Sequence, residues 1–471
     1  MNFIFASVFS YTVLQALLST TISIVLALPL AHFLYRFDMM GKKYFLALLP
    51  LLCIMPCKLA ALGTLLSFNL TGLPGILLAH CALNIPFALY LLLATYNTFD
   101  STWEKSAQQL GASNWQTYKT IYLPFLKPTI QSSAIIIFLL CFSSFSIPLL
   151  LGTHEYHLTP DIKISQLYTT DNAWTATLYF LMRLAIIMPL CITYMNTTAR
   201  WANTWRDSQQ RTTETYNPWL HGYHWLLYCV APLIIILTPF TALLYAIYKE
   251  NVFSFFKKII VGNNDLLLNV PIHTPIINSI LLGAVSGIGS VILGFIFYKL
   301  LYVIQHAHVK KALAIVISFS FIIGSVGCGI IASWFIRSSI FSAFTIAAAC
   351  HMLLNFPFAY RVIKTQMIGW QPEWELLASN FGATRAYRLK TLDWPFLRSS
   401  LYQAFCITFG LSLTEVGAGS IFGNTTGITI PMAIHMYREH NFMPGVMGLS
   451  LLLLLCVFLL AYAINRCVAE A

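Results

Sequence analysis

Two polar segments of this sequence carry residue types that can recognise another molecule, at the same spacing in both. Each has a glutamate, an alanine three residues later and a glycine seven residues later: Glu104, Ala107 and Gly111, then Glu375, Ala378 and Gly382. Ser101 and Glu104 have capping-box spacing, in which a hydroxyl and a carboxylate bond the free N–H groups that open a helix. Glycine can adopt the left-handed conformation that ends a helix. Each segment is therefore predicted to be a short helix, a sharp turn and a second short helix that ends at Pro124 or Pro395.

The chemistry of these segments is that of docking. Their helices are short, carry glutamate and offer tryptophan, alanine and leucine as a narrow apolar face, which suits insertion into a groove of a protein. A helix that rests on lipid headgroups would show a basic face opposite a wide apolar one. Docking is the favoured interpretation and headgroup anchoring is the alternative. Two docking helices imply a two-fold or pseudo-two-fold partner.

The composition decides where these segments are held. The chain has 471 residues, of which 58% are hydrophobic and 9% are charged, and its mean hydropathy is +0.73. Soluble proteins carry about 25% charged residues, so the sequence predicts an all-α protein that crosses a membrane many times. The formal net charge of +11 therefore does not indicate a nucleic-acid partner. The eleven cysteines lie mostly in apolar runs and indicate neither disulfides nor a metal site, and no cofactor is expected.

About eleven membrane-spanning helices are predicted. They lie near 7–35, 44–68, 74–97, 129–151, 174–198, 224–248, 273–304, 311–336, 341–365, 401–423 and 443–465. The N-terminus lacks the features of a cleaved signal peptide, so 7–35 is expected to be a retained span. Of the 27 lysines and arginines, 19 fall in one set of alternate loops and 6 in the other. This asymmetry predicts that both polar segments and the C-terminus are cytoplasmic and that the N-terminus is outside.

The two polar segments belong to an internal repeat, in which Glu104 aligns with Glu375 without a gap. In this alignment 16 of the 47 positions from 80 to 126 are identical, where composition alone gives roughly three. An even number of spans separates the copies, which predicts a parallel repeat about an axis along the membrane normal. We expect two halves: 1–215, with its loop at 100–128, and 216–471, with its loop at 371–399.

At these residues the sequence resembles the permease subunits of binding-protein-dependent ABC importers. Their cytoplasmic loop has the form EAA, three residues, glycine, about nine residues, an apolar residue, any one residue and then LP. Both copies here have the glutamate, glycine and proline, with the glycine seven residues after the glutamate where the strict form has six, and Lys105, Leu376 and Trp394 also depart from that form. Two copies in one chain resemble the fused two-half permeases, which include thiamine and ferric-iron importers. The nearest likeness is to the thiamine permeases, in "GILLAHCALNIPF", "FLLCFSSFS" and "EVGAGSIFGNTTGITIPMAIHMY". That family often begins with a further span, which this sequence lacks.

The resemblance implies a type I (MetI-like) permease fold and a mechanism. A periplasmic binding protein would deliver the solute, and the loop helices would seat in two copies of a cytoplasmic ATP-binding subunit. Glu104 and Glu375, with Ala107 and Ala378, would contact that subunit, and Gly111 and Gly382 would shape the turn. The chain has no G-x-x-x-x-G-K-[ST] phosphate loop, so it is not expected to be an enzyme and ATP would be hydrolysed by the separate subunit. Its location would be the bacterial inner membrane.

Three ionisable residues lie within predicted spans: Lys58, Arg183 and Glu415. Each would cost roughly 2.5–3.5 kcal/mol at the bilayer centre, so they should face the bundle or a wet cavity. They are candidates for the translocation pathway, and Glu415 could receive a cation such as thiamine. The alternative is that Glu415 pairs with Arg183 or Lys58 and is structural.

Other functions remain open at this stage. The solute could be thiamine, one of its phosphates or ferric iron. A self-sufficient secondary transporter is also an alternative, since parallel repeats occur in that class. It would leave the docking loops without a purpose.

Overall fold

The computed structural model describes most of the chain. The described residues are 2–38, 41–53, 55–97, 99–154, 157–169, 173–201, 214–215, 224–250, 252, 255–257, 264–265, 270–271, 273–304, 306, 309, 313, 323–331, 343–367, 372–416 and 428–469. They pack into two compact units, Met1–Lys249 and Glu250–Ala471.

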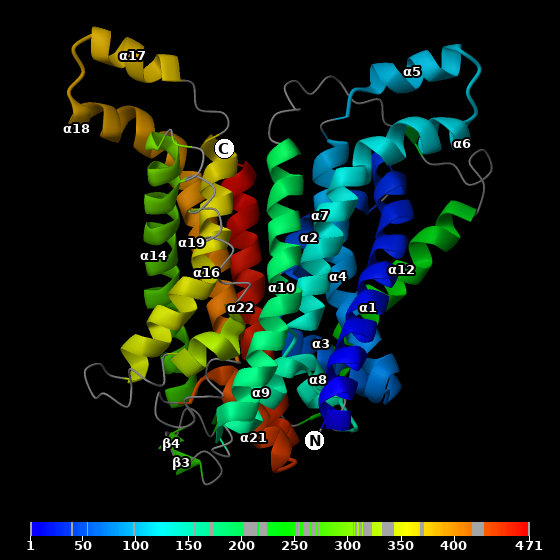
Figure 1. Ribbon diagram of the computed structural model, residues 1–471, viewed down its shortest axis with the longest axis vertical. Coiled ribbons are helices and arrows are strands. Elements are labelled where there is room, and N and C mark those ends of the chain that lie inside the picture. The colour runs from blue at the N-terminus through cyan, green and yellow to red at the C-terminus, as the bar shows by residue number, and fades with distance from the viewer. Residues whose placement is uncertain are drawn as a thin grey trace. The chain divides into compact units, whose positions relative to one another are not determined.

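The first unit is a bundle of long apolar helices with two pairs of short ones (Figure 1). Its helices are α1 (Asn2–Arg36), α2 (Lys42–Cys53), α3 (Cys57–Phe68), α4 (Gly72–Tyr96), α5 (Ser101–Gln109), α6 (Asn114–Thr117), the π-helix η1 (Tyr118–Tyr122), α7 (Leu123–Phe142), α8 (Ser146–Leu151), α9 (Pro160–Thr169), α10 (Ala173–Trp201) and α12 (His224–Lys249). Two short strands, β1 (Phe37–Asp38) and β2 (Glu214–Thr215), pair in parallel.

Polar contacts inside this bundle fix how its helices cross. α1 packs along α4 and α7, and α12 packs along α3. The Ser19 hydroxyl of α1 lies 3.3 Å from Nδ1 of His80 on α4. The Gln15 side chain donates to the Cys141 carbonyl of α7 at 3.0 Å. Buried hydrogen bonds of this kind satisfy polar groups that would otherwise cost free energy in an apolar interior, so they specify one arrangement of α1, α4 and α7.

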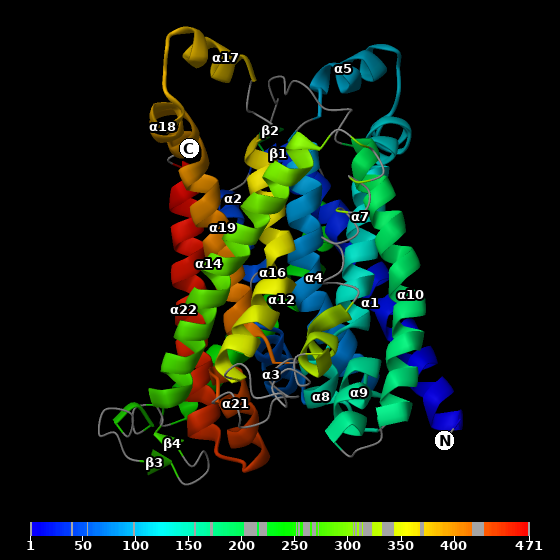
Figure 2. The same cartoon turned by 60° about the vertical axis from the view of Figure 1, so that its left-hand side comes forward.

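The second unit repeats the plan of the first (Figure 2). Its elements are β3 (Asn264–Asp265), β4 (Val270–Pro271), α14 (His273–Val303), α16 (Ala343–Met367), α17 (Pro372–Asn380), α18 (Arg385–Arg388), the π-helix η3 (Leu389–Asp393), α19 (Trp394–Thr414), α21 (Ile430–Glu439) and α22 (Met443–Ala469). The two strands form an antiparallel pair.

Small residues bring α14 and α19 together. A Cβ added at Gly283 would lie 3.1 Å from the ring of Phe409, and one at Gly287 would lie 3.2 Å from that of Phe405, so a larger side chain at either position would require the ring to shift. Beside this contact the Ser412 hydroxyl of α19 lies 2.7 Å from Nδ1 of His351 on α16. His351 is the repeat partner of His80, so each unit has a buried histidine bonded to a serine on a neighbouring helix.

The predicted repeat is confirmed and extends further than the identical residues do. The first residues of α1 and α14, of α4 and α16, of α5 and α17, and of α7 and α19 all have the same spacing along the chain as Glu104 and Glu375. For α9 and α21, and for α10 and α22, the spacing along the chain between the first residues is one residue shorter. Each predicted half, 1–215 or 216–471, contains one copy of the repeat, and the boundary between the halves stays a prediction. The packing instead groups α12 with the first unit, through its contacts with α3, α4 and α1.

The predicted helical membrane fold is confirmed, but the count of about eleven spans is not. Within the described residues, eight helices are long and apolar enough to cross a membrane: Ala6–Arg36, Gly72–Tyr96, Asn114–Phe142, Trp174–Tyr194, Val230–Lys249, His273–Leu301, Phe344–Lys364 and Met443–Leu460. The prediction of one span at 44–68 is wrong, because Pro56 is extended and separates α2 from α3. The prediction for 129–151 runs too far, since α7 ends at Phe142. Most of predicted span 311–336 lies outside the described residues.

Candidate functional site

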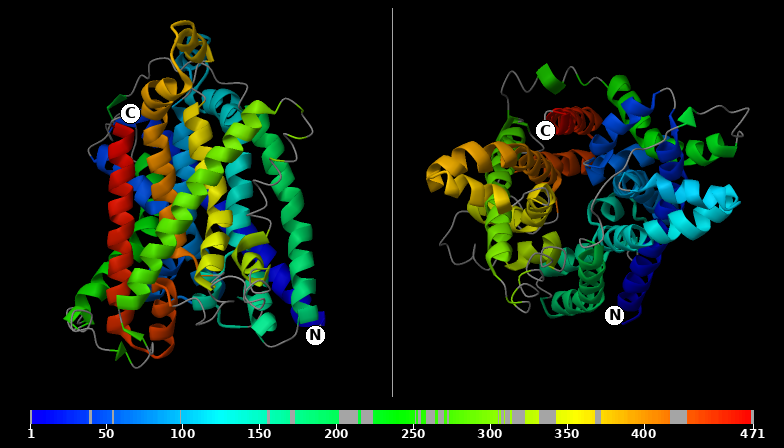
Figure 3. Two further views of the ribbon diagram at one scale, coloured as in Figure 1. Left: turned by 90° about the vertical axis from the view of Figure 1, so that its left-hand side faces the viewer. Right: turned by 90° about the horizontal axis from the view of Figure 1, so that it is seen from above.

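The first polar segment forms a hairpin of two short helices, α5 and α6, at the end of the first unit where α1 ends. α5 lies beyond the ends of the long helices, and α6 returns to the bundle (Figures 1 and 3). Seen from above in Figure 3, this hairpin extends outward from the bundle. The geometry is the predicted one of a short helix, a turn and a second short helix.

Capping residues differ from the prediction at the start of α5. The N-cap is Asp100, whose carboxylate accepts from the Thr102 N–H at 2.9 Å, and Ser101 is the buried first residue of the helix. A carboxylate both accepts this bond and faces the positive end of the helix dipole. The predicted capping box at Ser101 is therefore wrong. A capping box does occur one helix later, between Ser113 and Gln116.

Glycine ends the first helix of both hairpins, as predicted. Gly111 has φ +83° and Gly382 has φ +74°, both in the left-handed region. In the first copy the Ala112 N–H donates to the Ala107 carbonyl at 3.0 Å, and the same bond recurs in the second copy, from Ala383 to Ala378. This six-to-one bond closes a Schellman turn. The alanines of the motif thus supply the acceptors that lock each turn.

The second helix of each hairpin does not end at its proline. α6 continues through η1 into α7, past Pro124, as one helix from Asn114 to Phe142. The π-turn accounts for this, because its wider winding, seen in the bond from the Leu123 N–H to the Tyr118 carbonyl, makes room for the proline ring. The second copy has η3 at the matching residues. The prediction that the short helices end at Pro124 and Pro395 is therefore wrong, and each hairpin is continuous with a long helix.

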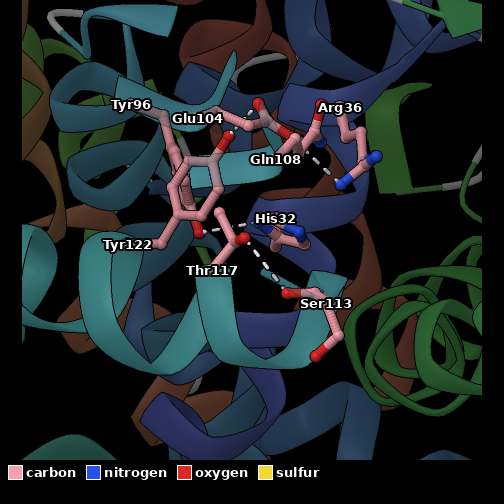
Figure 4. A network of polar contacts seen from close by, with 8 residues as sticks. All are labelled: His32, Arg36, Tyr96, Glu104, Gln108, Ser113, Thr117 and Tyr122. Atoms are coloured by element: carbon pink, nitrogen blue, oxygen red, sulfur yellow. Dashed lines mark hydrogen bonds and ion pairs between the residues drawn. The ribbon is translucent and has the colours of Figure 1, made fainter. Parts of the chain in front are cut away.

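The carboxylate of Glu104 is held by its own chain. It accepts a hydrogen bond from the Tyr122 hydroxyl at 2.6 Å and lies 3.3 Å from the guanidinium of Arg36, the last residue of α1. Gln108, one turn further along α5, donates to the same carboxylate at 3.2 Å. Figure 4 shows these side chains meeting between α5, η1 and α1. Tyr122 and Arg36 were missed in the sequence analysis because they lie far from Glu104 along the chain.

Large apolar side chains project from both hairpins. At the tip, Leu110 is 89% exposed, and its repeat partner Phe381 is 88% exposed. Other exposed aromatic and aliphatic residues on the hairpins are Trp103, Trp115, Leu377, Tyr387 and Trp394. Exposed apolar groups gathered at the end of an element mark an interaction surface. The sequence analysis did not single out Leu110 or Phe381, although each directly precedes the turn glycine.

Each hairpin has an aromatic contact near its base, but the two contacts use different positions of the repeat. The rings of Trp374 and Phe396 lie 6.0 Å apart, edge to face. In the first copy Trp103 has this geometry with Phe99, whereas the repeat partner of Phe396 is Phe125. Ala378 is half-buried. The backbone of Glu375 lies in α17, and its side chain is outside the described part of the structure.

The three candidate pathway residues have different surroundings. Arg183 is fully buried on α10 and lies 2.6 Å from Asp161 of α9, with the Ser143 hydroxyl at 3.2 Å. Lys58 is buried in the first turn of α3, and Glu415 is half-buried directly after α19. Asp161 was missed because it lies outside the predicted spans. The Asp161–Arg183 pair joins α9 to α10.

The loop between α8 and α9 is organised by a histidine. Nδ1 of His157 accepts from the backbone N–H of Thr153 at 3.2 Å and from that of His154 at 3.3 Å. Burial, reinforced by the positive charge of a protonated His154, lowers the pKa of His157. The neutral ring is therefore the form that holds this loop.

The sequence of this chain is similar to those of known transport proteins. Residues 3–201 match the family model of the binding-protein-dependent transport system inner membrane component. The thiamine transport system permease protein ThiP of Haemophilus influenzae is 24% identical over 95% of this chain and 86% of its own length. The proteins of the same name from Brucella abortus and Escherichia coli are 25% and 26% identical over 96% of the chain, and the alignments cover 86% and 87% of their lengths. These findings confirm the predicted resemblance.

Proposed function

We propose that this chain, an inner-membrane permease of an ABC importer, carries a small organic cation of the thiamine class across the membrane. It forms the transmembrane path, and a separate ATP-binding subunit supplies the energy. A binding protein on the outer side delivers the solute; the family description supports this in calling the transport system binding-protein-dependent.

The observation that carries this proposal is the pair of matching hairpins. Each presents a large apolar side chain, Leu110 or Phe381, at the tip of a turn closed by the same backbone bond. Each is continuous with a long helix, so force applied at the tip reaches the transmembrane bundle without a flexible joint. Two hairpins of one design fit two copies of an ATP-binding subunit, with the apolar tips and the motif alanines and glycines forming the contact.

The lysine and arginine asymmetry of the sequence supports a cytoplasmic position for both hairpins. In that position they meet the ATP-binding subunits, while the start of α1 lies at the outer face. A bacterial inner membrane is the location consistent with the family description.

Thiamine, or one of its phosphates, is the proposed solute. The support is the name of the relatives, which match this chain from end to end. Glu415 is the candidate residue for receiving the cation in the pathway, with Lys58 as a second pathway candidate. Arg183 is reassigned from the pathway to structure, because its guanidinium is bonded to Asp161.

Reconstituted vesicles test the proposal. The chain is purified, inserted into proteoliposomes with its ATP-binding subunit, and given the periplasmic binding protein and labelled thiamine, thiamine pyrophosphate or ferric iron in parallel. We expect ATP-dependent accumulation of thiamine or its pyrophosphate that requires both partners. Accumulation of iron alone would show that the solute is ferric iron and not thiamine. Uptake driven by an ion gradient without the ATP-binding subunit would show that the chain is a secondary transporter.

A further inference from the structure

We propose that Glu104 is a positioning residue that fixes the first docking hairpin to the end of α1, through Arg36 and Tyr122, rather than a group that contacts the ATP-binding subunit. This inference rests on the proposed function, since it assigns how docking is passed to the transmembrane helices. We call the three side chains the Glu104 lock.

The lock joins three elements that are far apart along the chain. Arg36 ends α1, Glu104 lies in the first turn of α5, and Tyr122 ends η1. One carboxylate oxygen lies 3.3 Å from the Arg36 guanidinium and the other accepts from the Tyr122 hydroxyl at 2.6 Å. Both oxygens are therefore engaged, and the side chains of Arg36 and Glu104 are only 21% and 17% exposed. Little of this carboxylate is left to face another protein.

Aromatic packing makes the lock rigid. Tyr122 is 2% exposed, and its ring stacks on Phe99, with the ring centroids 4.5 Å apart. The ring of Tyr96, on α4, packs against that of Tyr122. The Tyr96 hydroxyl lies at hydrogen-bond distance, 3.1 Å, from Nδ1 of His32 on α1. Figure 4 shows His32 and Tyr96 beside the lock. A hydroxyl on a ring with this little freedom gives Glu104 one position, so α5 cannot tilt without moving η1 and the end of α1.

The sequence of the second copy differs at the two positions that match the partners of Glu104. At the positions that match Arg36 and Tyr122 in the repeat, the sequence has Ala307 and Asp393. Alanine has no charge to pair with a carboxylate, and an ionised aspartate repels one. The glutamate is thus present in both copies of the motif, as Glu104 and Glu375, while the lock partners are not. The combination of partners that holds Glu104 is therefore not repeated in sequence at the matching positions of the second copy.

The lock has a signature that differs from a contact with the ATP-binding subunit. If Glu104 positions the hairpin, loss of the carboxylate leaves the docking surface in place and weakens transmission. Solute carried per ATP hydrolysed then falls, while the affinity for the ATP-binding subunit stays near that of the unchanged chain. If Glu104 touches the subunit, the affinity falls first and Arg36 has no part in it.

A double-mutant cycle on the reconstituted transporter distinguishes these cases. The variants are Glu104→Gln, Arg36→Met and the two combined, and the readouts are affinity for the purified ATP-binding subunit and solute carried per ATP. We expect each single variant to lower the solute-to-ATP ratio on the order of fivefold, and the combined variant to be within about twofold of either. Arg36→Lys, which keeps the charge, should recover much of the ratio.

Tyr122→Phe guards against loss of folding, because it removes only the hydroxyl and keeps the buried ring. It should lower the ratio as Glu104→Gln does. Tyr118→Phe is its matched control: it removes a hydroxyl from the same π-turn, and the described contacts of Glu104 do not include Tyr118. That control should leave the ratio unchanged.

Two outcomes would overturn the inference while leaving the proposed function intact. One is that Glu104→Gln lowers affinity for the ATP-binding subunit about tenfold and Arg36→Met does not. The other is that the effects of the two single variants multiply in the combined variant. Failure of the proposed function looks different, because the unchanged chain would then bind no ATP-binding subunit at all.

Discussion

Replacement of Gly111 by alanine tests how far the shape of the turn controls docking. Gly111 has φ +83°, and a Cβ placed there meets nothing within 4 Å. Crowding therefore adds nothing, and the whole effect comes from the left-handed backbone, which costs an alanine about 1–2 kcal/mol. If the hairpin must hold this turn to dock, a loss of about 1 kcal/mol lowers affinity for the ATP-binding subunit about fivefold.

Two further substitutions at Gly111 set the scale. Gly111→Asn should change affinity little, because asparagine tolerates the left-handed region. Gly111→Pro should do most, since proline confines φ to negative values and removes an N–H. In the native turn that N–H donates to the Gln108 carbonyl at 3.0 Å. A cost of about 3 kcal/mol or more corresponds to at least a hundredfold loss. Combined with Gly382→Pro, it should abolish uptake while the spans remain inserted.

Gly41 supplies a matched control. It lies outside the hairpins, has φ +89°, and a Cβ there also meets nothing within 4 Å. Gly41→Ala should therefore lower thermal stability as Gly111→Ala does and leave the affinity unchanged. The assay is equilibrium binding of the purified ATP-binding subunit to the chain in lipid nanodiscs, with uptake measured in parallel. The reasoning fails if Gly111→Ala binds within twofold of the unchanged chain, or if Gly41→Ala weakens binding equally.

Three other predictions concern the docking tips, the buried ion pair and pH. Leu110→Asp and Phe381→Asp should each weaken binding of the ATP-binding subunit at least tenfold, and neither should lower the melting temperature because both side chains are exposed. Tyr44→Asp, which also changes an exposed side chain, is the control, and equal weakening of binding by it would contradict the docking role. Asp161→Asn removes the carboxylate that lies 2.6 Å from the buried Arg183 guanidinium, and it should cost about 3–5 kcal/mol of stability. The combination of Asp161→Asn with Arg183→Met should largely restore that stability, and equal melting temperatures in detergent for the single and combined variants would contradict this. The folded chain holds His157 neutral, with its pKa below the usual value near 6.5, so its contribution to folding stability is fully present above pH 6.5 and is lost as the pH falls. His157→Asn, which keeps a hydrogen-bond acceptor, should remove this pH dependence. A melting temperature that varies with pH as much in that variant as in the unchanged chain would refute the prediction.

The lengths of the apolar runs and the positions of two glycines predicted much of the fold and the hairpins. The long apolar runs became the long helices, and Gly111 and Gly382 stop their helices as expected, because both signals are local. The sequence could not predict that the helix is broken at Pro56 but continues past Pro124. Both are prolines in apolar stretches, and only the π-turn before Pro124 allows the helix to continue.

Contacts between residues that are distant along the chain could not be predicted from the sequence. The partners of Glu104 lie on other elements, Arg36 at the end of α1 and Tyr122 at the end of η1, and Asp161 meets Arg183 only once α9 and α10 pack. Ser101 and Asp100 are both good caps, and the backbone angles at Asp100 decide between them. The exposure of Leu110 and Phe381 depends on where each hairpin lies, so it could not be predicted from one leucine and one phenylalanine in a largely hydrophobic sequence.

Site-specific photocrosslinking at the tips tests the central claim most directly. Leu110, and separately Phe381, is replaced by the photoreactive residue p-benzoylphenylalanine in the assembled transporter, which is then irradiated in lipid. Docking of both hairpins predicts a covalent product with the ATP-binding subunit from each position, and none from the same residue placed at Tyr44. Crosslinks to lipid alone, from both tips, would contradict the account and assign the hairpins to the membrane surface.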